Sequence, residues 1–205
     1  MVPIARPLID AGVPTLLLDA RCHGRSDDAE FTSMPRFAED VAAGVRWLRD
    51  RPVVDPERIL LLGHSVGAGA CLMVARDDPR IAGVVSVSSM ADPRAMMTRL
   101  LRGAHLPGPC VWLALRYVEH VIGMPFSAFA PLATVGTLEV PVLLVHGERD
   151  TVVPLTDAQR LASAAPGAKF LVVPGAGHAN VPDGELVGRA LREFAVRTVA
   201  GSPEV

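Results

Sequence analysis

The chain has 205 residues, of which half are hydrophobic and 20% are charged, and its formal net charge is -2 at pH 7. This composition is typical of a globular protein and argues against a disordered chain, and the length suits a single domain, residues 1–205. Because the arginines are scattered without a basic run, we expect no nucleic-acid partner.

Five short aliphatic runs are typical of strands in a parallel sheet, because such strands are buried on both faces. In chain order they are residues 14–20, 58–64, 81–88, 140–147 and 168–175. Helix-length segments separate most of them. The sequence therefore predicts the α/β class, with a mostly parallel sheet and helices on both faces.

The first predicted crossover helix covers residues 34–51, where apolar residues recur at helical spacing. Further helices are expected after the second, fourth and fifth strands, at residues 66–77, 157–165 and 183–200.

The interval between the third and fourth strands is too long for a loop in a compact α/β unit, so we predict a small helical cap insert at residues 91–137. One helical face within it carries Val111, Leu115, Val118 and Ile122. Trp112, Phe126 and Phe129 are expected mainly to pack against the sheet, although a cap above a site also lines its pocket.

The segment Gly63-His64-Ser65-Val66-Gly67 lies between a predicted strand and a predicted helix. G-x-S-x-G in that context is typical of a nucleophile elbow, in which the serine has a strained backbone. We expect side chains at 63 and 67 to collide with nearby backbone, and the Val66 N–H to be free to bind an oxyanion. The alternative is a glycine-rich connection with an incidental serine.

Two later residues complete a possible catalytic set. Asp150 and His178 each follow a predicted strand, so the chain order is Ser65, Asp150, His178, which is the order in α/β-hydrolases. All three lie just past the carboxyl ends of parallel strands, where open α/β sheets build their sites.

Other residues compete for these roles. His23, His64 and His146 are alternatives to His178, and Asp92 is an alternative to Asp150. The serines at the end of the third strand, Ser86, Ser88 and Ser89, are expected to be hydrogen-bonded structural hydroxyls.

The chain resembles the α/β-hydrolase superfamily, in particular its monoacylglycerol-lipase and serine-aminopeptidase-like branch. The resemblance is carried by "LLLDARCHGRSDD" (16–28), "RILLLGHSVGAG" (58–69), "PVLLVHGERDTVVP" (141–154) and "VPGAGHAN" (173–180). It implies an α/β-hydrolase fold.

The resemblance also implies three strands before the helix that residues 4–13 finish, and an HG-type loop that donates a second oxyanion N–H. Both are absent, so the fold is expected to be N-terminally truncated. The missing third strand would lie between residues 14–20 and 58–64. Either those two strands pair directly, or a partner fills the gap, or Met1 is not the natural start. We favour the last of these three alternatives. Cys22 also stands where the family usually has glycine.

The longest apolar stretches are interrupted by charged residues or are too short to cross a bilayer. The N-terminus lacks the basic start and the apolar core of a secretory signal. We therefore expect no membrane span and a cytoplasmic location. Cys22, Cys71 and Cys110 are widely spaced, and we interpret them as reduced packing residues rather than as a disulfide framework or a zinc site.

The sequence thus predicts a serine hydrolase that cleaves an ester, thioester or small amide through an acyl-enzyme, with no cofactor or metal. An apolar acyl substrate is expected to contact His64, Met90, Trp112 and Val152. The alternative is a truncated, catalytically weak or inactive binding module. The strand edge left open by the missing segment would favour a homo-oligomer.

Overall fold

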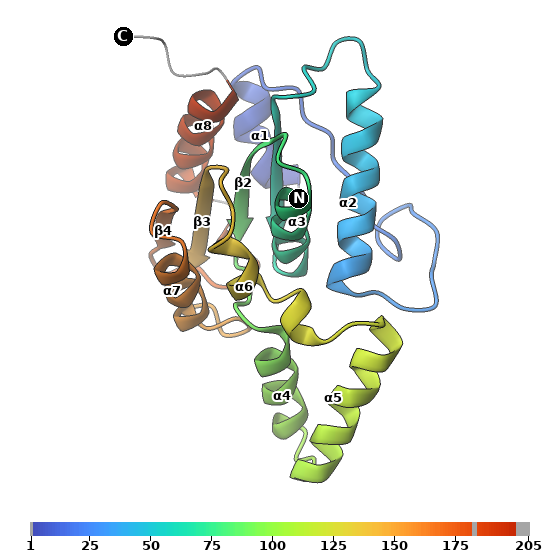
Figure 1. Cartoon of the computed structure of the whole chain (residues 1–205). Helices are drawn as coiled ribbons and strands as arrows, with labels where there is room; N and C mark the ends of the chain where they lie inside the picture. The colour runs from blue at the N-terminus through green and yellow to red at the C-terminus, as the bar shows by residue number, and fades with distance from the viewer. Residues whose placement is uncertain (1, 182–183, 200–205) are drawn as a thin grey trace.

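The computed structural model describes residues 2–181 and 184–199 (Figure 1). Four strands, β1 (Ile59–His64), β2 (Ile81–Val87), β3 (Val142–Gly147) and β4 (Lys169–Val173), form one parallel sheet in the order β1-β2-β3-β4. The α/β class and four of the five predicted strands are therefore confirmed. Because all four strands are parallel, their carboxyl ends meet at one end of the sheet.

The first predicted strand in chain order, residues 14–20, is wrong: this segment has no regular secondary structure. Its leucines at 16, 17 and 18 stay 41–46% exposed. The neighbour that a strand needs is missing, since β1 pairs with β2 alone in the described part of the chain. The alternative in which residues 14–20 pair directly with β1 is thereby excluded.

Helices cover both faces of the sheet, and each face has its own core. On one face, α2 (Met34–Arg49) packs on α3 (Val66–Asp77), and α7 (Leu155–Ala164) packs on β3. On the other face, α1 (Val2–Asp10) packs on α8 (Glu185–Val199), which contacts β1 and β2. Successive strand residues alternate between the two cores.

The predicted helices are confirmed with small shifts at their ends. α2 begins where the Ser33 side chain accepts a hydrogen bond from the Arg36 N–H, with Pro35 in the first turn. The outer ends predicted for the last helix, residues 183 and 200, lie outside the described residues.

The interval between β2 and β3 contains α4 (Pro93–Gly103), α5 (Gly108–Ile122), η1 (Phe126–Ala128) and α6 (Pro131–Val135). Helices α4 and α5 form a hairpin that projects from the lower end of the molecule (Figure 1). Glu119 lies buried at its base, where it accepts hydrogen bonds from the Arg94 and Arg116 guanidinium groups and from the Phe126 N–H.

The inward face of α5 is as predicted, because Val111 and Leu115 are buried. Phe126 and Phe129 also pack in the core, with ring centroids 5.6 Å apart. Trp112 differs: its side chain is 60% exposed, so the expectation that it packs against the sheet is wrong.

All three cysteines are free. Burial raises the pKa of the Cys71 thiol to about 12, as suits a packing residue. Cys110 is exposed on α5, so the interpretation as a packing residue is wrong there.

No single helix among residues 2–181 and 184–199 is long and apolar enough to cross a membrane. Within the described residues, one bent pair of helices, Gly108–Ile122 with Phe126–Val135, meets that test by length and composition.

Candidate active site

Ser65 connects β1 to α3 through a sharp turn, with φ 54° and ψ -119°. A positive φ is rare for a residue with a side chain, so this backbone is strained. The Ser65 N–H donates to the Val87 carbonyl, 2.8 Å away, which attaches the turn to the end of β2. The local geometry is that of an elbow that holds a serine at the carboxyl end of the sheet.

The two glycines of the elbow differ in their roles. A Cβ at Gly63 would lie 2.2 Å from the Gly67 carbonyl oxygen, so a side chain cannot fit there without a backbone shift. A Cβ at Gly67 would meet nothing within 4 Å, and the expected collision at that position is wrong.

The first turn of α3 begins at Val66, directly after the serine. The N–H groups of a first helical turn have no preceding turn to bond, and here the Ser65 carbonyl accepts from Ala68 and Gly69. Val66 is thus the first residue of the helix after Ser65, and its role as an oxyanion donor stays a prediction.

Asp150 lies just after β3, with a fully buried side chain. One carboxylate oxygen accepts hydrogen bonds from the Val152 and Val153 N–H groups, at 2.9 and 2.8 Å. The other lies 2.7 Å from His178 Nδ1. Burial acts to raise the pKa of Asp150, but the bonds from His178 and the two N–H groups outweigh it and keep the pKa below its usual value.

His146 contributes to the same turn in a way that the sequence analysis missed. It is buried at the end of β3, where its Nε2 lies 2.9 Å from the Val153 carbonyl oxygen and 3.5 Å from Asp150 Oδ2. The imidazole thus stabilises the turn that carries the Asp150 carboxylate. Its position one residue before the end of a buried strand was the only available signal.

His178 lies in the loop after β4, and the loop is fixed from two sides. The Gly177 N–H donates to the Asn180 side chain at 2.6 Å, and the Arg149 N–H donates to the Ala176 carbonyl at 2.8 Å. With its Nδ1 against Asp150, the imidazole presents Nε2 as the nitrogen free for other contacts.

His64, beside the serine, contacts His178 directly. Its Nε2 lies 2.8 Å from the His178 carbonyl oxygen, and the two rings are 4.7 Å apart between centroids. Burial lowers the pKa of His64, and the bond to the carbonyl opposes this only in part. A neutral His64 that donates to the carbonyl therefore links the β1 end of the site to the β4 end.

The structure does not complete the expected set. Among the hydrogen bonds of the described residues, none joins Ser65 to His178. The acid and the imidazole are together, and the serine is connected to them through its neighbour His64.

The other predicted substrate contacts are spread over the molecule. Met90 is buried just after β2, Val152 is 47% exposed beside Asp150, and Trp112 lies on the outer part of the α4–α5 hairpin. Within the ranges 2–181 and 184–199, no three His, Cys, Asp or Glu side chains are placed to hold a metal ion.

The competing residues have structural partners of their own. The Asp92 side chain caps α4 by accepting from the Arg94 and Ala95 N–H groups. His23 packs edge-on against Phe37 in the turn after residues 14–20.

Cys22 in the same turn has φ 59°, in the left-handed region, which agrees with the expectation of glycine there. The expectation for the serines at the end of β2 is wrong in part, because the Ser86 and Ser88 hydroxyls are buried without a hydrogen-bond partner.

Comparison with known proteins agrees with this architecture. An uncharacterised Mycobacterium tuberculosis protein, Rv2307c, is 32% identical over 203 residues, which cover 95% of this chain. The chain spans 64% of the length of that relative.

Two solved structures share the fold. The esterase domain of a Rhodothermus marinus protein is 27% identical, with a TM-score of 0.66, over 97% of this chain and 79% of that one. The Butyrivibrio proteoclasticus protein Est1E, solved with ferulic acid, is 24% identical, with a TM-score of 0.74, over 97% and 82%.

The fold is thus that of the α/β-hydrolases, as the resemblance implied, and the described residues contribute four parallel strands to it. The sequence profile of the prolyl oligopeptidase family matches residues 35–195, which include the elbow and both later loops. The chain therefore belongs to the prolyl oligopeptidase family.

Proposed function

We propose that the protein is a serine hydrolase in which Ser65, His178 and Asp150 act as a catalytic triad. Ser65 Oγ attacks the acyl carbonyl while His178 Nε2 takes its proton, and His178 then donates that proton to the leaving group. Water hydrolyses the resulting acyl-enzyme through the same imidazole. Asp150 keeps the imidazole oriented and stabilises its charged form.

The observation that carries the proposal is the buried contact of 2.7 Å between His178 Nδ1 and Asp150 Oδ2. A carboxylate whose pKa is held low remains ionised at neutral pH, so it stabilises an imidazolium in the transition state. The strained elbow that carries Ser65 at the same end of the sheet supplies the nucleophile.

The proposed mechanism needs Ser65 Oγ to reach His178 Nε2. Catalytic hydrogen bonds are often long or misaligned before substrate binds, and they tighten in the complex. The contact between the His64 and His178 rings places the imidazole beside the residue that precedes the serine. We propose that rotation of the Ser65 side chain closes the remaining gap when substrate binds.

The proposed substrates are carboxylic esters, thioesters or small amides with an apolar acyl group. Val152, two residues after Asp150, is 47% exposed and offers an apolar side chain beside the triad, and the Val66 N–H would bind the oxyanion. The Rhodothermus marinus neighbour is named as an esterase domain, which supports esters as the first class to test.

An active-site fluorophosphonate probe tests the proposal. We expect the wild-type protein to be labelled and the Ser65→Ala variant to be unlabelled, with p-nitrophenyl ester hydrolysis lost in parallel. Ser163→Ala, which removes an exposed serine on α7, serves as the matched control and is expected to label like the wild type.

A second candidate is a catalytically weak or inert binding module. The missing Ser65–His178 bond and the unpaired segment at residues 14–20 favour it. Folded wild-type protein that neither labels nor hydrolyses esters would establish this second candidate and exclude the first.

A further inference from the structure

We propose that the end of the α4–α5 hairpin docks on an anionic lipid surface. The hairpin tip, defined as Leu100, Trp112 and Leu113, holds large apolar side chains that are 60–66% exposed. They come from the last turns of α4 and the first turns of α5, so they gather near the turn between the helices. Large apolar side chains that cluster at an exposed end are typical of an interaction site.

Basic side chains surround this apolar end. Between Pro93 and Met124 the chain has four arginines and a single carboxylate, Glu119, although the whole chain has a net charge of -2. Glu119 is buried in ion pairs with Arg94 and Arg116, whereas Arg99 and Arg102 are exposed and pair with no carboxylate in the described part of the chain.

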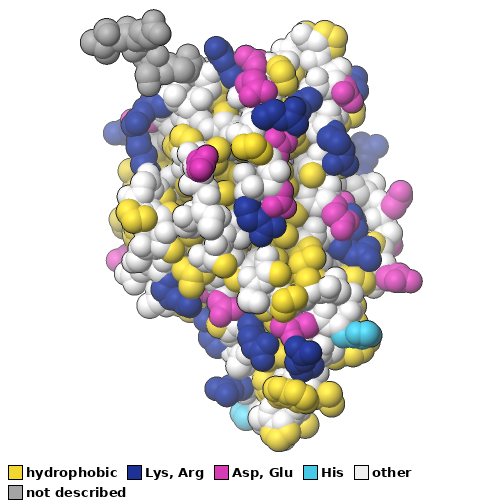
Figure 2. Space-filling view, in the orientation of Figure 1, with side chains coloured by type: hydrophobic (Ala, Val, Ile, Leu, Met, Phe, Trp, Pro, Cys, Tyr) yellow, Lys and Arg dark blue, Asp and Glu magenta, His cyan; other side chains and the backbone are white. Residues whose placement is uncertain are grey.

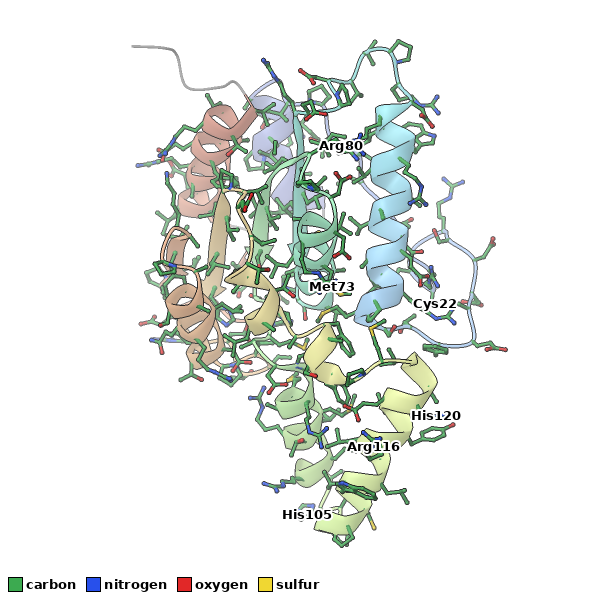
Figure 3. All side chains as sticks on the ribbon, viewed as in Figure 1. Cys22, Met73, Arg80, His105, Arg116 and His120 are labelled. Carbon is green, nitrogen blue, oxygen red and sulfur yellow. The ribbon has the colours of Figure 1, made fainter. Side chains whose placement is uncertain are left out.

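Figure 2 shows the apolar surface at the lower end with arginines beside and above it. In Figure 3, His105 marks the turn of the hairpin, and Arg116 and His120 lie progressively farther from it along α5. Tyr117, which is 66% exposed, lies on the same stretch of α5. Along the hairpin, the apolar tip is followed by aromatic and basic side chains. This order matches that of acyl chains and anionic headgroups at a membrane surface.

The charges select this occupant over a second copy of the chain. A symmetric contact between two tips would bring the unpaired Arg99 and Arg102 of each copy together, with no exposed carboxylate on the hairpin to balance them. An anionic surface complements the arginines, and a projecting end suits a deformable lipid layer. Such a contact lies at the surface and needs no spanning helix.

Vesicle sedimentation of the full chain tests the proposal. We expect at least tenfold tighter binding to phosphatidylcholine mixed with phosphatidylglycerol than to phosphatidylcholine alone, with a strong reduction at high salt. The double substitution Arg99→Gln and Arg102→Gln should weaken binding to the mixed vesicles by about thirtyfold, since each basic residue near an anionic surface contributes about fivefold.

The apolar contribution is tested by Trp112→Ser with Leu113→Ser, which should weaken binding at least tenfold. Val53→Ser is the matched control, because Val53 is 93% exposed in the loop at the opposite end of α2 from the hairpin. In a Trp47→Phe background, Trp112 is the remaining tryptophan, and its emission should shift to the blue when mixed vesicles are added.

Circular dichroism and the melting temperature show whether each variant is folded. The proposal is overturned if folded wild type does not bind mixed vesicles at low salt, or if the tip variant and Val53→Ser bind equally. It is also overturned if the tip substitutions instead abolish a concentration-dependent dimer in sedimentation or capture of an acidic protein. Fluorophosphonate labelling without vesicles reports separately on the proposed hydrolase.

Discussion

The two sides of the candidate site differ in how firmly the chain holds them. On the β3–β4 side, Asp150 and His178 are joined by a short contact, and backbone N–H groups bind the carboxylate. On the β1 side, Ser65 has no bond to the imidazole, and β1 pairs with β2 alone among the described residues. The acid and base are thus positioned by contacts within this chain, whereas the serine lies next to an open sheet edge.

This contrast teaches where the proposed activity is vulnerable. β3 pairs with β2 on one edge and with β4 on the other, so the start of the loop that carries Asp150 is constrained from two sides. β1 is constrained from one side only among the described residues. Substitutions on the two sides of the site should therefore differ in their effects.

Asp150→Asn should lower kcat for ester hydrolysis by about 10⁴-fold, because an amide cannot stabilise the imidazolium or hold the correct tautomer. Steady-state kinetics on a p-nitrophenyl ester measure the effect. Asp92→Asn is the matched control, since that side chain only caps α4, and its kcat should stay close to the wild-type value. Equal losses in the two variants would remove Asp150 from the proposed triad.

A leucine-to-alanine substitution in β3 and one in residues 14–20 should have unequal effects on stability. Leu144→Ala in β3, where the side chain is 2% exposed, should reduce the free energy of unfolding by about 2–5 kcal/mol. Leu17→Ala, at a side chain that is 46% exposed, should change it by less than about 1 kcal/mol. Urea denaturation measures both, and a large loss at Leu17 would show that residues 14–20 are buried in solution.

Gly63→Ala should reduce the free energy of unfolding by about 1–3 kcal/mol and lower the rate of fluorophosphonate labelling, because the new Cβ would press on the Gly67 carbonyl. Gly67→Ala, where a Cβ has space, is the comparison and should have the smaller effect in both assays. The reverse ranking would contradict the described elbow.

His64→Gln tests the link between the two sides. The folded protein lowers the pKa of His64 below its usual 6.5, so the unfolded chain takes up this proton first as the pH falls. Stability from the neutral imidazole is therefore full above about pH 6.5 and is lost as the pH falls through the folded-state pKa. The wild type should lose more unfolding free energy than His64→Gln between neutral and mildly acidic pH.

Urea denaturation over that pH range provides the measurement. His105→Gln, at an exposed histidine on the hairpin turn, is the control and should keep the wild-type pH dependence. Parallel curves for the wild type and His64→Gln would show that the His64 environment does not perturb its titration.

Much of this protein could be predicted from local sequence patterns. The four paired strands and the main helices follow from runs of buried residues and helical spacing, which depend on the residues themselves and their near neighbours. The elbow follows from the glycine at 63, because the geometry of a tight turn excludes a side chain there. The chain order of Ser65, Asp150 and His178 was also evident.

The tertiary structure alone decided which of these residues meet. Residues 14–20 have a strand-like sequence but no bonded neighbour, and a strand is stable only when another strand satisfies its N–H and C=O groups. His64 contacts His178, which is far away in the sequence, and His146 contacts Val153 across a turn. No local sequence pattern encodes such contacts. Trp112 was expected to pack inward, yet the direction of the α4–α5 hairpin leaves it exposed, because packing of Val111 and Leu115 determined which face of α5 turned to the core.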